Sequence, residues 1–260
     1  TRMNNEEIYM TYVALSNHPK EKGRDIKTAL VKIGNIDNPN TYERIGVITP
    51  EGTEDKDVII FPEPINGKYV MIHRPHNWRK KDILKADGKI YVKKEDRYVE
   101  WLLDELPDYF PEKPSMWICY SYDMKKWFNH KLLAEPAYWW EELKIGAGTQ
   151  PIKTEYGWLL IYHGVSNNDG RKYYRAGAML LDINNPERII ARTREPVLEP
   201  EYDFEINGIT NFVVFPEGAI VKDKKLFVYY GCADKYVGVA TICLNEFLEW
   251  LIEENSIVSQ

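Results

Sequence analysis

Two cationic side chains stand at the ends of a glycine-containing segment, 144-KIGAGTQPIKTEYGWLLIYHGV-165. Lys144 precedes a Gly-Ala-Gly turn, and His163 lies within an apolar run that is typical of a β-strand. A third cation, Arg74, ends another such run, KYVMIHRP. Arginine offers a planar fork to oxyanions and lysine a compact charge, so the three residue types suit the binding of an anion.

Each of these residues also has a purely structural interpretation. A histidine between Tyr162 and Gly164 is compatible with a hydrogen-bonded core residue. Lysine and arginine often bury their aliphatic stems while the charged head stays in water, which would make Lys144 and Arg74 surface charges. Residue type alone leaves both interpretations open.

Aromatic and acidic residues add candidates for sugar binding. In AYWWEELKIG, Trp139 and Trp140 precede Lys144, and an aromatic face suits a sugar ring; packing at the rim of a sheet explains the pair equally well. Glu63 belongs to a Phe-Pro-Glu motif that recurs at 215–217, so it either reaches a pocket or shares a structural role with its second copy.

Composition excludes several function classes. The 260 residues carry a net charge of −6, whereas nucleic-acid binding normally needs a basic footprint. There is no apolar stretch long enough to span a membrane. Three cysteines without metal-ligand spacing indicate buried thiols of a reducing compartment, and TRMNNEEIYM has no signal core. These features predict a cytoplasmic protein without a metal, a nucleotide loop or a Ser-His-Asp triad.

A unit of alternating, aromatic-rich strands recurs along the chain. Its first strand is expected at 4–14, 66–75, 155–164 and 222–231, and its second at 26–33, 115–122, 174–183 and 237–244. Three units have a preceding strand, at 57–64, 148–155 and 211–218, and further strand-like runs lie at 44–49, 131–136 and 196–200. About four short strands per repeat are typical of β-propeller blades.

The sequence therefore predicts an all-β fold, 1–260, forming one propeller domain; a β-sandwich is the alternative. The first and last units each lack a strand, so the propeller appears N-terminally incomplete. A charged insertion, 76–114, is expected to be a solvated excursion. Apolar spacing over 244–255 predicts a C-terminal helix.

Four motifs in order, KDVIIFPEPINGKYVMIHRP, KIGAGTQPIKTEYGWLLIYHGV, YRAGAMLLDINNPERIIARTREPVLEPE and YYGCAD, resemble glycoside hydrolase family 130. This family comprises β-mannoside phosphorylases and related β-mannosidases, and the resemblance extends from residue 1 to about 248. It implies a five-bladed β-propeller with a central active site. It also implies inverting phosphorolysis of β-mannosides to α-mannose 1-phosphate, with inorganic phosphate as co-substrate.

The resemblance assigns roles to individual positions. Arg74, Lys144 and His163 match positions that bind phosphate, and Asp57 and Asp234 match positions that line the sugar pocket. With Glu63 and Trp140 as further candidates, these form the predicted substrate site. The expected partners are a β-linked mannooligosaccharide and phosphate, and self-association into a homo-oligomer is compatible with the sequence.

One family feature is not found in these residues. The general-acid aspartate is expected just upstream of the segment that matches NNEEIYM, before residue 1, so no general acid is assigned. General acid catalysis commonly contributes about 10²- to 10⁴-fold. Two alternatives therefore accompany the phosphorylase prediction: a β-mannosidase that uses water, and a non-catalytic sugar-binding propeller.

Overall fold

The computed structural model describes residues 1–260 except 4, 18–23, 95–96, 102–106, 108 and 258–260. It is an all-β structure in which the paired strands of each sheet run antiparallel. The chain forms two compact units, Thr1–Glu135 and Pro136–Gln260. Each is described by itself.

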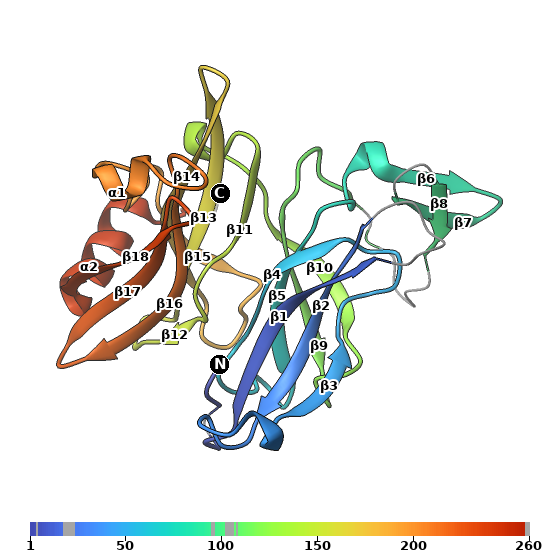
Figure 1. The fold of residues 1–260 in the computed structure, drawn as a ribbon, viewed down its shortest axis with the longest axis horizontal. Helices are drawn as coiled ribbons and strands as arrows, with labels where there is room; N and C mark the ends of the chain where they lie inside the picture. The colour runs from blue at the N-terminus through green and yellow to red at the C-terminus, as the bar shows by residue number, and fades with distance from the viewer. Residues whose placement is uncertain (4, 18–23, 95–96, 102–106, 108, 258–260) are drawn as a thin grey trace. The chain divides into compact units, whose positions relative to one another are not determined.

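Besides a small third sheet, the first unit contains two sheets whose strands follow in chain order (Figure 1). One has the order β1-β2-β3, from Ile8–Asn17, Arg24–Ile33 and Glu43–Val47, with the 3-10 helix η1, Pro39–Thr41, before β3. The other has the order β4-β5-β9-β10, from Asp55–Ile60, Tyr69–Pro75, Met116–Ser121 and Phe128–Ala134. Chain-order hairpins of this kind are typical of propeller blades.

The segment between β5 and β9 corrects the prediction of a solvated excursion at 76–114. It contains the 3-10 helix η2, Lys80–Asp82, and a small sheet of β6, β7 and β8, which span Ile83–Ala86, Lys89–Lys94 and Arg97–Glu100. Trp78, Trp101 and Phe110 pack with Trp117 of β9 in a buried cluster. The prediction was based on the charged residues of this segment, whereas its aromatic residues bury their side chains.

The second unit also contains two sheets. One has the order β11-β13-β14-β15, from Lys144–Ala147, Trp158–Asn168, Arg171–Leu181 and Ile189–Arg192, and the short β12, Ile152–Lys153, pairs with β13. The other has the order β16-β17-β18, from Val214–Lys222, Lys225–Cys232 and Tyr236–Cys243. Helical segments are η3, Trp139–Glu141, α1, Asp203–Ile206, and α2, Leu244–Asn255.

Most predicted elements are confirmed, and α2 has the predicted bounds. Two predictions are wrong. The KIGA part of the expected Gly-Ala-Gly turn is strand β11, in which Gly146 pairs with His163. Residues 196–200 form no strand but make an isolated bridge between Leu198 and Ala176, while the fourth strand of this sheet is β15.

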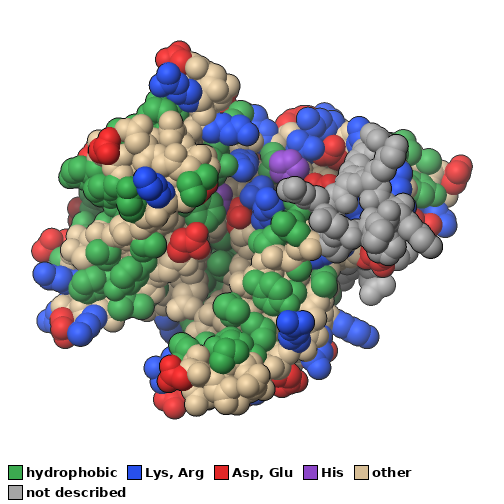
Figure 2. Space-filling view, viewed as in Figure 1, with side chains coloured by type: hydrophobic (Ala, Val, Ile, Leu, Met, Phe, Trp, Pro, Cys, Tyr) green, Lys and Arg blue, Asp and Glu red, His purple; other side chains and the backbone are tan. Residues whose placement is uncertain are grey.

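The inner strands form the cores of the two units. All residues from Val70 to Pro75 of β5 and from Trp158 to Ser166 of β13 are buried, because strands covered on both faces lose the alternation of apolar and polar residues. By contrast, the outer strand β18 exposes Val237 and Val239. Hydrophobic side chains are accordingly visible on the surface of this C-terminal sheet, at the left of Figure 2.

No helix in the described part of the chain is long and apolar enough to cross a membrane. The all-β class is thus confirmed, with each sheet built as a meander.

Candidate functional site

In the first unit, two of the predicted site residues form an ion pair. Asp57 of β4 accepts hydrogen bonds at Oδ2 from Nε and Nη2 of Arg74 on β5, at 2.7 and 2.6 Å. Both side chains are nearly buried, 4% exposed for Arg74 and 10% for Asp57. The sequence had assigned Arg74 to phosphate and Asp57 to sugar, and the structure brings the two together.

The backbone at Asp57 departs from a regular strand. The pairing of β4 with β5 shifts between Lys56 and Ile59, and Asp57 has a φ of 55°. A left-handed conformation is unusual for a residue with a side chain and costs about 1–3 kcal/mol. The bulge turns the Asp57 carboxylate toward Arg74, whose backbone pairs with the neighbouring Lys56.

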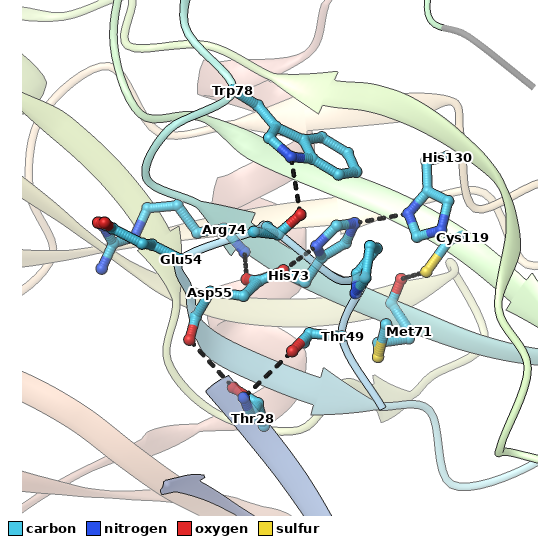
Figure 3. Close-up of polar contacts among 12 residues, drawn as sticks. Thr28, Thr49, Glu54, Asp55, Met71, His73, Arg74, Trp78, Cys119 and His130 are labelled. Atoms are coloured by element: carbon cyan, nitrogen blue, oxygen red, sulfur yellow. Dashed lines mark hydrogen bonds and ion pairs between the residues drawn. The ribbon is translucent and has the colours of Figure 1, made fainter. Parts of the chain in front are cut away.

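A second carboxylate of β4, Asp55, forms hydrogen bonds with residues of β5. It is fully buried and accepts at Oδ1 from the backbone N–H of Arg74, at 3.1 Å (Figure 3). Its Oδ2 lies 2.6 Å from Nδ1 of His73. An ionised carboxylate only accepts hydrogen bonds, so with Asp55 as the acceptor Nδ1 of His73 is the donor. Asp55 therefore fixes both the His73 ring and the backbone that carries the Arg74 side chain.

The chain of hydrogen bonds continues to His130 on β10 (Figure 3). Nδ1 of His130 lies 3.0 Å from Nε2 of His73, which accepts because Nδ1 of His73 carries the proton. Nε2 of His130 is buried and has no hydrogen-bond partner among the described residues. Burial, with a smaller contribution from His73, lowers the pKa of His130 to about 3, so the ring is neutral near pH 7.

His73, His130 and Cys119 also place three potential metal-ligand atoms within 4.8 Å of one another. However, His73 uses both ring nitrogens in hydrogen bonds, and burial raises the pKa of the Cys119 thiol well above its usual value. A thiol must lose its proton to ligate a metal, so this arrangement is better described as a buried hydrogen-bonded network. The sequence prediction of a site without metal stays a prediction.

Sequence analysis missed this network. The signals were present: Asp55 stands two residues before Asp57, and His73 directly precedes Arg74. Neither residue belongs to a recognisable catalytic spacing, because the contacts join strands that are separated along the chain.

Glu63 lies away from the ion pair. Asp55 pairs with Pro75 at one end of the β4–β5 hairpin, whereas half-buried Glu63 lies in the connection at the other end, next to the Ile65–Lys68 bridge. The second Phe-Pro-Glu copy differs, because Pro216 lies within β16 beside a shift of register. The two Phe-Pro-Glu copies therefore have different structural settings.

In the second unit, Lys144 and His163 share one face of a sheet. Lys144 pairs with Val165, and Val165 pairs with Tyr174; in the next row, His163 pairs with Gly146. Side chains of paired residues project to the same face of a sheet, as do residues two apart on one strand. The Lys144 ammonium lies 5.2 Å from the centre of the Tyr174 ring.

His163 itself is fully buried. Its ring lies 4.4 Å from that of Phe215 and is stacked 6.2 Å from that of Tyr174. The burial is that of a core residue, and the position also places the imidazole next to the ring that Lys144 covers. Tyr174 is the residue that sequence analysis missed here, although YRAGAM was part of a motif.

Trp140 corrects a sequence prediction. Its side chain has no exposed surface, and its indole N–H donates to the Arg194 carbonyl. The ring lies so close to Gly164 that a Cβ there would be 2.6 Å from Cε3, and it approaches Gly177 closer still. The absence of side chains at both glycines makes room for the ring, so Trp140 is a packing residue and presents no face to a sugar. The neighbouring Trp139 is half exposed.

A buried ion pair fixes the segment that leads into β11. Glu141 accepts at Oε2 from Nη2 of Arg192, at 2.6 Å, and from the backbone N–H groups of Ala137 and Tyr138. Its Oε1 accepts from the Tyr162 hydroxyl. Both oxygens of this carboxylate thus accept hydrogen bonds, three residues before Lys144.

Asp234, the remaining candidate, lies in the turn between β17 and β18. It is exposed and has a φ of 54°, and Ala233 before it has a φ of 48°. The turn is held by the Ala233 carbonyl, which accepts from the backbone N–H groups of Ile209 and Thr210. Asp57 and Asp234, the two predicted sugar-binding aspartates, therefore both have a left-handed backbone, which is often found at functional sites.

The comparisons with known proteins agree with these motifs. The family model described as beta-1,4-mannooligosaccharide phosphorylase, of glycoside hydrolase family 130, matches residues 109–253. A 1,2-beta-oligomannan phosphorylase of Thermoanaerobacter sp. (strain X514) is 39% identical over 206 residues, which cover 79% of this chain and 55% of that protein. A beta-1,2-mannobiose phosphorylase of the same organism is 41% identical, over 72% of this chain and 49% of that protein.

Among solved structures, a beta-1,2-mannobiose phosphorylase from Listeria innocua, in complex with beta-1,2-mannobiose, superposes with a TM-score of 0.72 at 34% sequence identity. The match covers 96% of this chain and 58% of the other. The chain thus spans about half the length of the curated relatives it matches.

Proposed function

Because the chain belongs to glycoside hydrolase family 130, we propose that it is part of an inverting phosphorylase that cleaves β-mannosides with inorganic phosphate. The products are α-mannose 1-phosphate and the shortened sugar. The observation that carries this proposal is the similarity of 39–41% to two β-mannoside phosphorylases, which extends over more than two thirds of the chain.

In the proposed reaction, a phosphate oxygen attacks the anomeric carbon from the face opposite the leaving sugar. The bond from this carbon to the glycosidic oxygen breaks with inversion, and the leaving oxygen takes up a proton from a general acid. No described residue is assigned to that acid. Because phosphate attack and protonation complete the reaction, the proposal needs no metal or other cofactor.

Arg74 and Lys144 are the cations proposed to bind phosphate. Arg74 presents the part of its guanidinium that Asp57 does not occupy, and Lys144 contributes a point charge. The imidazole of His163 lies beside Tyr174, whose ring the Lys144 ammonium also approaches, and supports this face of the sheet. Asp57, Asp234 and Glu63 were predicted to bind sugar; for Asp234, the exposed turn with its left-handed backbone supports that role.

We further propose β-1,2-linked mannosides as the substrate class and a five-bladed propeller as the complete fold. The linkage is supported by the names of the two Thermoanaerobacter relatives and of the Listeria innocua enzyme at 34% identity. The propeller is supported by the meander order of the sheets.

The test is a phosphate-dependent assay on the complete gene product. We expect α-mannose 1-phosphate from β-1,2-mannobiose plus phosphate, and a much lower rate with β-1,4-mannobiose. Release of free mannose at the same rate without phosphate would instead identify a β-mannosidase. Binding of mannobiose without turnover in either condition would identify a non-catalytic sugar-binding protein.

A further inference from the structure

The contact between Arg74 and Asp57 engages one edge of the guanidinium group. Both donors that Asp57 takes, Nε and Nη2, lie on the side edge of the planar fork and converge on a single oxygen, Oδ2. The end edge, formed by Nη1 and the second N–H of Nη2, makes no side-chain hydrogen bond with any described residue. An arginine held in this way keeps two parallel N–H groups, which is the geometry that bidentate phosphate binding requires.

The cost of building this contact indicates that it is specific. Asp57 reaches Arg74 only because its backbone adopts a φ of 55° at a bulge of β4. The same arginine is held a second time, through its backbone N–H, by the buried Asp55. Two carboxylates on one strand thus fix the two ends of one residue, the backbone and the guanidinium group.

From these contacts we infer that Asp57 is a positioning residue for Arg74 rather than a ligand of the sugar. It orients the end edge of the guanidinium group toward an oxyanion, and Asp55 fixes the strand from which the side chain extends. The inference rests on the proposed function, because it takes phosphate as the anion that Arg74 binds. It replaces the role that the sequence had suggested for Asp57.

Two substitutions at position 57 separate the side chain from the backbone. Asn tolerates a left-handed backbone and glycine adopts it readily, so Asp57→Asn and Asp57→Gly remove the charge or the whole side chain without adding strain. Asp223 has a φ of 50° in the exposed β16–β17 turn, and Asp223→Asn and Asp223→Gly are the matched controls.

The measurements are the Kd of inorganic phosphate by titration calorimetry and the KM values for phosphate and mannobiose. A misplaced group typically costs up to about 100-fold, and we expect both Asp57 variants to raise the Kd and KM for phosphate by about 10- to 100-fold. In the Asp57 variants, the KM for mannobiose should stay within about twofold of the wild-type value. In both Asp223 variants, the Kd for phosphate and both KM values should stay within about twofold of the wild type. In an Arg74→Gln background, Asp57→Asn should have no further effect on phosphate binding, because Asp57 acts through Arg74.

Several outcomes would overturn the inference. A rise confined to the KM for mannobiose would restore the sugar-binding role of Asp57. A tighter Kd for phosphate in Asp57→Asn would mean that the carboxylate repels the anion, and an unchanged Kd would mean that it does not position Arg74. If the wild-type protein binds no phosphate, the proposed function and this inference both fail, whereas phosphate binding that ignores Asp57 removes the inference alone.

Discussion

The ammonium group of Lys144 lies over the ring of Tyr174, 5.2 Å from its centre, on the sheet face that also carries His163. The aromatic face attracts the cation and holds its long side chain near one position. The same ring is also stacked with that of His163. This row of side chains gives the second unit a cation whose position is set by the sheet.

The first prediction concerns Lys144. Lys144→Met keeps the aliphatic stem and removes the charge, so the KM for phosphate should rise by about 10- to 100-fold, as expected for one charge-assisted hydrogen bond. Tyr174→Leu should raise it by only about two- to fivefold, the value of an exposed cation–π contact. Lys153, whose ammonium lies 5.8 Å from the centre of the Trp158 ring, is the control, and Lys153→Met should leave the KM unchanged. A phosphate KM that is insensitive to Lys144→Met in an active enzyme would remove Lys144 from the site.

The secondary-structure elements were largely predictable from the sequence. Alternating and apolar runs locate strands well, and the 3.6-residue period located α2 because its apolar face packs against a sheet. A strand was wrongly predicted at residues 196–200 because this segment is apolar. Its Val197 and Leu198 side chains pack against the core, but its backbone makes only one bridge to β14 in the described residues.

Side-chain contacts between strands could not be predicted from the sequence. Arg74 and Asp57 were each singled out, yet their pairing depends on a bulge in β4 whose left-handed residue is an aspartate rather than a glycine. Trp140 was assigned to a sugar because tryptophan suits sugar rings; its burial depends on Gly164 and Gly177, which lie on two other strands. A residue type indicates what a side chain could do, whereas the register decides what it meets.

The second prediction concerns the packing of Trp140. Gly177→Ala should lower the free energy of unfolding by about 1–3 kcal/mol, because the added methyl group collides with the buried indole ring. Trp140→Phe removes the outer part of that ring, so Gly177→Ala should cost less in the Trp140→Phe background than in the wild type. Gly218→Ala is the control, since a Cβ at Gly218 meets no atom within 4 Å. Urea denaturation gives the free energies, and equal costs in both backgrounds would show that the two sites are independent.

The third prediction is a pH dependence of stability that arises from His130. Burial holds the folded-state pKa of His130 at about 3, below the ordinary 6.5. The unfolded chain therefore takes up a proton that the folded protein does not, and the contribution of His130 is complete above pH 6.5 and is lost as the pH falls from 6.5 toward 3. The loss approaches about 1.4 kcal/mol per pH unit.

The measurement compares the wild type with His130→Gln by urea denaturation between pH 7 and pH 4. The difference in slope, rather than the total slope, isolates His130, because carboxylates also titrate in this range. His76 is exposed, and His76→Gln should retain the wild-type slope. If His130→Gln does so too, burial does not keep the His130 ring neutral in the folded protein, and the lowered pKa is wrong.

The fourth prediction contrasts a buried ion pair with an exposed one. Glu141→Gln leaves Arg192 with a buried charge that has lost its counterion, and it also weakens the acceptor for the Tyr162 hydroxyl. Removing one partner of a buried pair typically costs about 3–5 kcal/mol. Lys89 and Glu100 form an ion pair with roughly half-exposed side chains, and Glu100→Gln should cost less than about 1 kcal/mol. Urea denaturation at neutral pH measures both free energies of unfolding.

Glu141 also holds the backbone that leads into β11, so Glu141→Gln should in addition raise the KM for phosphate through Lys144, whereas Glu100→Gln should not. A large loss of stability with an unchanged KM would show that β11 keeps its position without this carboxylate.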